Sequence, residues 1–468
     1  MTSTWHRVAR TALVVTCVAG PTSAKADDRP GPVRHGYEIT ASDRAKVYAA
    51  VRRRLEAGRA RDARGSSGFT AHWSASEIPA FARKYGMKCS ACHIAVPVLN
   101  SYGQNFKDNG YRMKVGTDDL RANEPAYWPL FAWLWKGYEF DAERIDGQTV
   151  QRRGGITNGA LAFGGLGSIS DKLSFRYVPI IYEDGLTFLD HGWIRYNQAF
   201  GSDWLNVKVG NTDLDLPISA GRDYNMGNAR FALLYAYRVP GSVSGFTFLG
   251  AQPGIELMGH DRGSRNRYAL SVFNAPGAPR AHCTFCSPGV YGRVTRRFEL
   301  AEGFLRDVQV GAFGSYSTWP VGADTSDLKG QSRFGGEVEF LLGSDVLPLR
   351  VTAVGMTGWD DRALVPQATS DPTFNAGLLQ LEYVPSLPLA FYGRLQVIRN
   401  DRQGVAGRPD DFGDQDFQLL GAHYLFEVNS RYGALLELTY SRQKFKRTGP
   451  QGEDVTDQIL YLGAHLIF

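Results

Sequence analysis

The chain has 468 residues, 53 of them glycine, with 43% hydrophobic and 12% aromatic residues and a formal net charge of +5 at pH 7. A nearly neutral chain gives no case for binding nucleic acid, which requires a basic surface. Beyond residue 26 there is no run of 18 apolar residues, which excludes an ordinary transmembrane helix. Many glycines and aromatic residues at modest hydrophobicity are typical of many short strands, so we expect an all-β fold.

The first 26 residues have the pattern of a secretory signal peptide. Arg7 and Arg10 give a basic start, residues 11–20 are apolar, and Ala24-Lys25-Ala26 is a small-residue cleavage site. Cleavage would remove three positive charges and leave the mature chain at +2. The pattern therefore predicts an exported protein.

A polar segment follows over residues 27–75. One helix is expected in it, from about residue 42 to residue 59, because Val47, Val51 and Leu55 recur at four-residue spacing. The basic run at residues 52–54 is interpreted as a solvated face, with docking to a periplasmic partner or to lipid headgroups as the alternative.

Residues 76–126 hold the motif that carries chemistry, Cys89-Ser90-Ala91-Cys92-His93. The C-x-x-C-H pattern is typical of c-type haem attachment: the two thiols add across the haem vinyl groups, and the histidine is placed to ligate the iron. A thioredoxin-like pair beside a chance histidine would require a βαβ pattern, which this part of the sequence lacks. We predict one covalently bound haem c, attached through Cys89 and Cys92, with His93 as the proximal ligand.

The second axial ligand stays open on sequence grounds. Met113 is the first candidate, because it follows His93 by twenty residues and the chain could wrap the haem in between. His72 is the second candidate. Met87 is less favoured because it is close to the attachment site and would have to reach the opposite face of the haem. A different ligand, or no second ligand, is the remaining alternative. A Met thioether raises the haem potential, whereas His or an open site would change the role.

From about residue 127 to residue 468 the hydrophobic pattern has a period of two. Leu436, Leu438 and Tyr440, for example, alternate with Glu437 and Thr439. Alternation alone fits both a soluble sandwich and a membrane barrel, but short turns that alternate with longer polar loops favour an outer-membrane barrel. The short turns are expected near residues 170–171, 201–202, 262–263, 301–303, 343–345, 385–388 and 429–430.

With these turns as anchors we count about 16 antiparallel strands, from near Leu130 to Phe468, in a transmembrane β-barrel with both ends at the periplasm. The last eleven residues end in an aromatic residue and resemble the terminal strand signal of outer-membrane proteins. The longest loop is expected over residues 211–254, with a strand-like segment at 229–239 that would add a hairpin. General porins fold such a loop into the lumen. Aromatic residues expected in interfacial girdles are Tyr127, Trp128, Trp133, Trp193 and Trp204.

Two further features lie in the loops expected at the outer face. Cys283 and Cys286 lack a following histidine, so a local disulfide is preferred over metal binding with His282 or a redox-active pair. Several loops are also acidic. Carboxylate oxygens are suitable ligands for Fe(II), Mn(II) or Ca(II), so these loops could gather a cationic electron donor. The alternative is that the loops are polar only because they are exposed to solvent. The acidic residues are Asp213, Asp215, Asp360, Asp361, Asp410, Asp411, Asp414, Asp416, Glu453, Asp454 and Asp457.

The motif region resembles the cytochrome part of the fused monohaem cytochrome–porins, a family best known for outer-membrane iron oxidases. The likeness rests on residues 78–86, 89–93, 97–107 and 109–111, and beyond them only on barrel architecture and size. It implies a small, mainly helical cytochrome domain that plugs a roughly 16-stranded barrel in the outer membrane of a Gram-negative bacterium. Pro97, Leu99, Gly103, Phe106 and Tyr111 would then pack the haem or form the core of that domain.

The resemblance also implies an oxidoreductase that takes electrons from an extracellular donor, Fe(II) first of all. The electrons would pass through the haem to a periplasmic c-type cytochrome. Three alternatives stay open: outward transfer to an extracellular acceptor, a solute porin with a redox-sensing haem, and a haem enzyme with an open sixth position. The direction of transfer depends on the haem potential relative to its partners, which the sequence does not give.

Overall fold

The computed structural model describes residue 81 and residues 91–95, 98–112, 130–157, 159–185, 187–218, 233–248, 251–274, 288–300, 303–321, 327–344, 347–366, 368–386, 388–402, 411–429, 432–448 and 452–467. The signal peptide and the helix expected over residues 42–59 lie outside this part of the chain and stay predictions. None of the helices within the described ranges is long and apolar enough to span a membrane.

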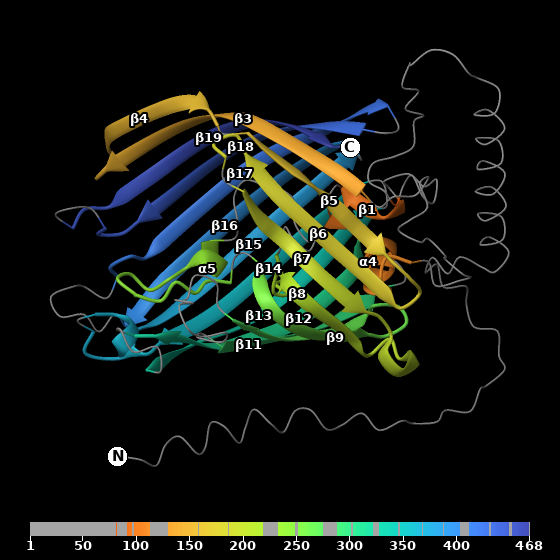
Figure 1. Ribbon diagram of the computed structural model, residues 1–468. Helices are drawn as coiled ribbons and strands as arrows, with labels where there is room; N and C mark the ends of the chain where they lie inside the picture. The colour runs from red at the N-terminus through yellow and green to blue at the C-terminus, as the bar shows by residue number, and fades with distance from the viewer. Residues whose placement is uncertain are drawn as a thin grey trace.

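A closed antiparallel barrel dominates the structure (Figure 1). Its strands are β3 (Leu130–Ile145), β4 (Gln148–Ile156), β5 (Ala160–Ser168), β6 (Leu173–Tyr182), β7 (Thr187–Tyr196), β8 (Asn206–Thr212), β9 (Gln252–His260), β10 (Asn266–Asn274), β11 (Pro288–Glu299), β12 (Leu305–Pro320), β13 (Leu328–Ser344), β14 (Leu347–Asp360), β15 (Thr373–Ser386), β16 (Leu389–Arg402), β17 (Gln415–Asn429), β18 (Tyr432–Phe445) and β19 (Val455–Ile467). The other elements are β1 (His93–Ala95), β2 (Val98–Leu99), α4 (Ser101–Asp108), α5 (Leu233–Ala236) and the 3-10 turns Ala199–Gly201 and Arg362–Leu364.

The described strand segments occupy 16 positions around the barrel. Strand β4 pairs with residues 138–145 of β3, and β5 pairs with residues 130–135 of the same strand. The two segments are therefore consecutive pieces of one broken strand. Strand β19 closes the ring on β3. The predicted all-β barrel of about 16 strands is confirmed.

The short turns lie at one end of the barrel, which we call the short-turn end. All seven turns expected from the sequence join neighbouring strands there, and β3 begins and β19 ends at the same end. The opposite end, the loop end, carries the longer connections, of which residues 213–251 form the longest in the chain. Two connections at the loop end are also short: residues 183–186 between β6 and β7, and the hairpin between β3 and β4, where Asp146 and Gly147 both have positive φ, as a two-residue type I′ turn requires.

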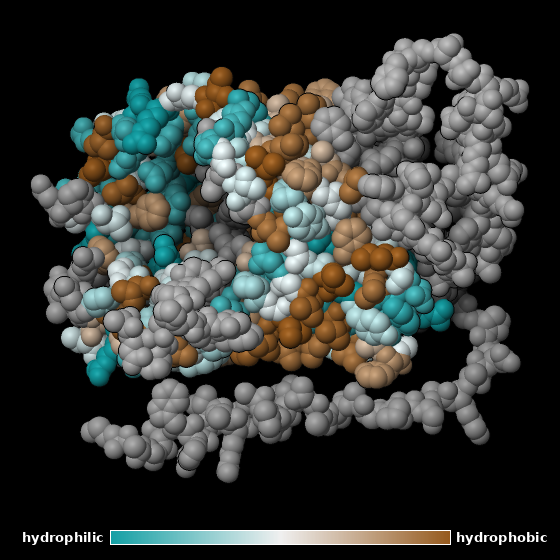
Figure 2. Space-filling view, viewed as in Figure 1, coloured by the Kyte–Doolittle hydropathy of each residue, from teal (hydrophilic) through white to brown (hydrophobic). Residues whose placement is uncertain are grey.

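The outer surface of the barrel is apolar and the inner surface is polar. On β18, Leu436 and Leu438 are 43% and 50% exposed, whereas the intervening Glu437 is 2% exposed. Figure 2 shows apolar side chains along the barrel wall and hydrophilic ones gathered toward the loop end. Outward apolar and inward polar residues are the arrangement that a bilayer requires. The chain is a multi-pass outer-membrane β-barrel.

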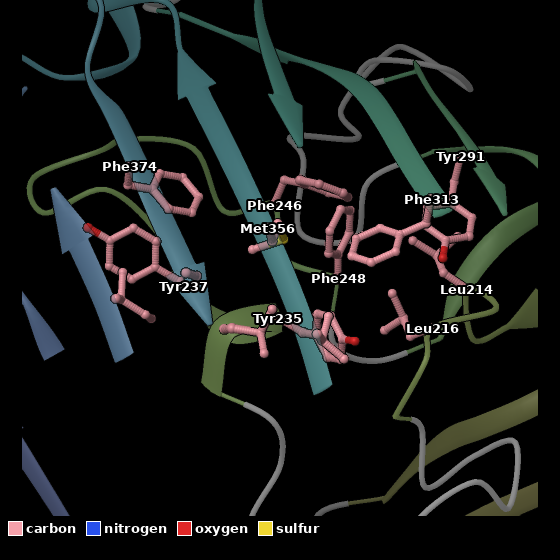
Figure 3. Close-up of a cluster of buried hydrophobic side chains, with 14 of the residues drawn as sticks. Leu214, Leu216, Tyr235, Tyr237, Phe246, Phe248, Tyr291, Phe313, Met356 and Phe374 are labelled. Carbon is pink, nitrogen blue, oxygen red and sulfur yellow. The ribbon is translucent and has the colours of Figure 1, made fainter. Parts of the chain in front are cut away.

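The described parts of the longest loop, residues 213–218 and 233–248, lie in the lumen and pack against the inner wall. Leu234, Tyr235 and Phe248 are nearly fully buried in one apolar cluster with wall residues such as Phe313 and Met356 (Figure 3). The hydrogen bond from the Leu234 amide to Gln396 Oε1 (3.2 Å) helps to hold the loop in place.

The strand expected at residues 229–239 is wrong for the described part of that segment, which forms the short helix α5. The apolar side chains of α5 pack on the inner wall of the barrel, and this burial stabilises the segment without strand pairing.

Two of the aromatic residues expected in girdles also point elsewhere. Trp193 is 7% exposed and packs inside the barrel against Tyr111. Trp133 donates a hydrogen bond to His465, a buried histidine (Nε1 to Nδ1, 3.1 Å). Trp204 is 47% exposed at the short-turn end, where it stacks on Tyr268, and fits the girdle prediction. Tyr127 and Trp128 lie outside the described residues.

Candidate functional site: the haem-attachment segment

The described part of the motif that predicts haem attachment lies beside α4 at the short-turn end of the barrel (Figure 1). Cys92 and His93 are both half-buried, and His93 begins β1, which pairs with β2. Cys89, the distal-ligand candidates and the outer cysteine pair fall outside the described residues, so their predicted roles stay predictions. These residues are His72, Met87, Cys89, Met113, Cys283 and Cys286.

Asn100 holds the motif against the start of α4. Its side-chain oxygen accepts a hydrogen bond from the Gly103 amide (2.9 Å), the usual N-cap interaction. Its side-chain nitrogen donates to the Ala91 carbonyl (3.1 Å), and its backbone amide donates to the Cys92 carbonyl (2.9 Å). One residue therefore caps the helix and fixes both carbonyls next to the second thiol.

Gly103 allows the closest approach between α4 and the motif. A Cβ at this position would lie 2.2 Å from the Cys92 carbonyl oxygen and 3.0 Å from a Leu99 methyl carbon. The first contact is with backbone, which cannot rotate out of the way. Only glycine therefore lets Cys92 sit this close to the helix.

The β1–β2 hairpin packs on the wall formed by β15, β16 and β17. Val98 is buried in an apolar cluster, and Ile94 packs against the same cluster. Burial of a Val side chain stabilises by about 1.5–3 kcal/mol. The wall residues of the cluster are Val384, Ala390, Tyr392, Phe417 and Leu419.

The other end of α4 is held by polar side chains of the opposite wall. Arg195 Nη2 donates to the Lys107 carbonyl (2.8 Å), and His260 Nε2 lies 3.2 Å from the Asp108 carbonyl. The last carbonyls of a helix lack partners within the helix and carry partial negative charge. Arg195 on β7 donates to one of these carbonyls and His260 on β9 contacts the next, so the barrel wall contributes to the C-terminal cap of α4.

A buried ion pair links the same end of α4 to β10. Asp108 Oδ2 lies 3.0 Å from Arg267 Nε, and the two side chains are 2% and 9% exposed. Gln104 donates a hydrogen bond to the other carboxylate oxygen (2.9 Å). Burial raises the pKa of the Asp108 carboxyl, but the charges of Arg267 and His260 outweigh it and hold that pKa below its usual range.

An aromatic group extends this contact. Tyr111 stacks on Trp193 of β7 and on Phe81, and Phe106 meets Phe81 edge to face. Gly110, with φ of +78°, lies so close to Asn197 that a Cβ would come within 2.7 Å of its side-chain nitrogen. The segment that the sequence analysis expected to form a small core thus packs directly on the inner face of the barrel.

The residues of the motif fit a covalently bound haem by the chemistry of their donor set. A thiol and an imidazole stand side by side on a segment fixed at both ends, and neither side chain is sealed in the apolar core. Within the described ranges there is no cluster of three or more His, Cys, Asp or Glu side chains that could hold a metal ion.

The acidic loop residues are mostly paired with cations. Asp360 lies 2.6 Å from an Arg333 nitrogen, and Asp454 lies 2.6 Å from Lys444. Asp215 pairs with Arg293 at 3.2 Å. These carboxylates stabilise the inner wall and the loop end of the barrel.

Arg195, His260 and Arg267 were not identified as functional residues from the sequence. In the sequence, the alternation of polar and apolar residues shows that these three side chains face the lumen. It does not show which residue each of them contacts there.

No model of a known protein family matches the chain, and no curated protein matches it. Three solved structures with a similar chain trace are outer-membrane proteins. An anion-selective porin from Comamonas acidovorans has a TM-score of 0.48 at 11% identity, covering 72% of this chain and 98% of its own. OprB of Pseudomonas putida has 0.47 at 11%, covering 72% and 93%. The channel DcaP of Acinetobacter baumannii has 0.44 at 12%, covering 72% and 96%.

Proposed function

We propose that the chain is an outer-membrane electron conduit that carries electrons from an extracellular donor to a periplasmic cytochrome. The observation that supports it best is the attachment of the Cys92–His93 segment to both walls of the barrel at the short-turn end. In barrels of this kind the short turns face the periplasm. A cofactor held there would lie at the mouth where a periplasmic partner can dock.

A covalently bound haem c supplies one-electron transfer in which no substrate bond is made or broken. The chain's own residues hold the attachment segment in place: Asn100 and Gly103 fix it to α4, and Asp108 fixes α4 to the wall. Rigid attachment favours electron transfer because it keeps the distances to both partners constant. Fe(II) as the donor rests on the family resemblance alone.

A second candidate function is a solute porin whose haem senses redox state. The closed barrel and the loop folded into its lumen favour it, because this arrangement constricts a pore. The two functions differ in what changes with the haem: a conduit passes electrons whatever its solute flux, whereas a sensor changes solute flux with redox state.

The test is anaerobic stopped-flow visible spectroscopy of the detergent-solubilised protein mixed with Fe(II) near neutral pH, beside His93→Ala. The conduit predicts a reduced c-type haem spectrum that appears rapidly in the wild type alone. A normal haem spectrum that Fe(II) does not reduce would contradict Fe(II) as donor. Solute flux that follows haem redox state in planar bilayers would favour the sensor.

A further inference from the structure

A small pocket lies between the C-terminal end of α4 and the inner wall formed by β6 to β10. Its volume is about 30 Å³, enough for one small chemical group. Its lining includes two carboxylates, Asp108 and Asp213, and an excess of cationic side chains. The cationic side chains are Lys107, Arg176, Arg195, Lys208 and Arg267.

The carboxylates of the pocket are already engaged. Asp108 pairs with Arg267 at 3.0 Å, and Asp213 Oδ2 lies 3.0 Å from His191 Nε2. Lys208 Nζ lies 2.7 Å from Glu256 Oε1, and Glu256 is not part of the pocket lining. The three carboxylates at this site, those of Asp108, Asp213 and Glu256, are therefore each in contact with a cationic or imidazole side chain other than Arg195.

Arg195 is 3% exposed and has no carboxylate within ion-pair distance in the described part of the chain. Its Nε donates to Asn197 (2.7 Å) and its Nη2 to the Lys107 carbonyl, but its Nη1 faces only the Met258 sulfur, at 3.8 Å. A buried charge without a counter-ion in contact is unfavourable. The guanidinium lies over the Tyr111 ring, 5.7 Å from its centroid, and the carboxylates of Asp108 and Glu256 act on it only from beyond ion-pair distance. Arg195 thus presents one weakly engaged donor beside the cavity and has no counter-ion in direct contact among the described residues.

From this arrangement we infer that the pocket binds a single carboxylate group against Arg195. A carboxylate offers a full negative charge and the planar pair of acceptors that a guanidinium prefers. Two sources carry this chemistry: a propionate of the haem, or a small free carboxylate. The first source rests on the proposed function; the second does not.

The experiment uses the full-length, haem-loaded protein in detergent and has two readouts. Resonance Raman spectroscopy follows the bending band of the haem propionates. Thermal unfolding followed by circular dichroism measures the effect of sodium formate against sodium chloride at constant ionic strength. The variants are Arg195→Gln and Lys107→Gln, which remove charge from opposite sides of the pocket. Thr212→Val, an uncharged change in the same lining, is the matched control.

A propionate in the pocket predicts a shifted band in both charge variants, an unchanged band in Thr212→Val, and no effect of formate. A free carboxylate predicts a saturable rise in the wild-type unfolding temperature with formate, which is lost in the two charge variants. Lys107→Gln keeps the test readable if Arg195→Gln does not fold. An unshifted band together with no specific formate effect would overturn the inference. A protein without haem would contradict the proposed function, while the formate readout would still test the pocket.

Discussion

Replacing Asp108 by Asn should release α4 from the barrel wall. The change keeps the shape of the side chain but leaves Arg267, 9% exposed, without its carboxylate. Removal of one partner of a buried ion pair costs about 3–5 kcal/mol. We expect the lower end, about 3 kcal/mol, because the amide oxygen can still accept the hydrogen bond from Gln104. Since 1.4 kcal/mol is a factor of ten, α4 should open roughly 100-fold more often.

Hydrogen exchange of the amides in Ser101–Asp108, read by mass spectrometry, measures this opening directly. Asp454→Asn is the control: it breaks an ion pair with Lys444 whose side chains are 31% and 35% exposed, and such pairs contribute at most about 1 kcal/mol. A double variant with Arg267→Gln should lose less stability than the two single changes predict together. If α4 exchanged at the wild-type rate in Asp108→Asn, the ion pair between Asp108 and Arg267 would not anchor the helix.

Three further outcomes follow from the same contacts. Gly103→Ala places a Cβ 2.2 Å from the Cys92 carbonyl and should lower the haem content per protein in a pyridine haemochrome assay; Gly155→Ala, with no atom within 4 Å, should not. The lowered pKa of Asp108 means that its carboxylate stabilises α4 at pH values above about 4, the pKa in the unfolded chain, and that this stabilisation is lost as pH falls through the folded pKa. The protection of the α4 amides relative to their intrinsic exchange rate should therefore fall in acid in the wild type and show no such step in Asp108→Asn. Tyr235→Ala removes a side chain that is 1% exposed, at a cost of about 3–5 kcal/mol, and should raise ion conductance in planar bilayers by loosening the inner loop; unchanged conductance would mean that this cluster does not constrict the lumen.

Much of the barrel could be predicted from the sequence because its rules are local. A period of two places alternate residues on opposite faces, and all seven short turns were found from their turn residues. The same locality explains the error at α5: an apolar run of strand character has no feature that distinguishes an edge strand from a loop packed on the inner wall. Local pattern therefore predicts elements and faces better than it predicts what fills the lumen.

The contacts of the candidate site could not be predicted in the same way. Arg195 and Lys107 are 88 residues apart, and His260 and Asp108 are 152 apart. The sequence alone predicts an attachment motif because the chemistry of that motif is concentrated in five consecutive residues. It could not identify Trp193 as a partner of Tyr111, since a lumen-facing and a membrane-facing tryptophan differ only in register.

We propose that electrons cross the barrel through the segment that carries Cys92 and His93. The most direct test places the protein in vesicles that enclose a soluble c-type cytochrome and adds Fe(II) outside. Rapid reduction of the enclosed cytochrome is expected with the wild type and none with His93→Ala inserted to the same extent. Equal reduction with both proteins would show that Fe(II) itself passes through the pore and would contradict electron transfer through this segment.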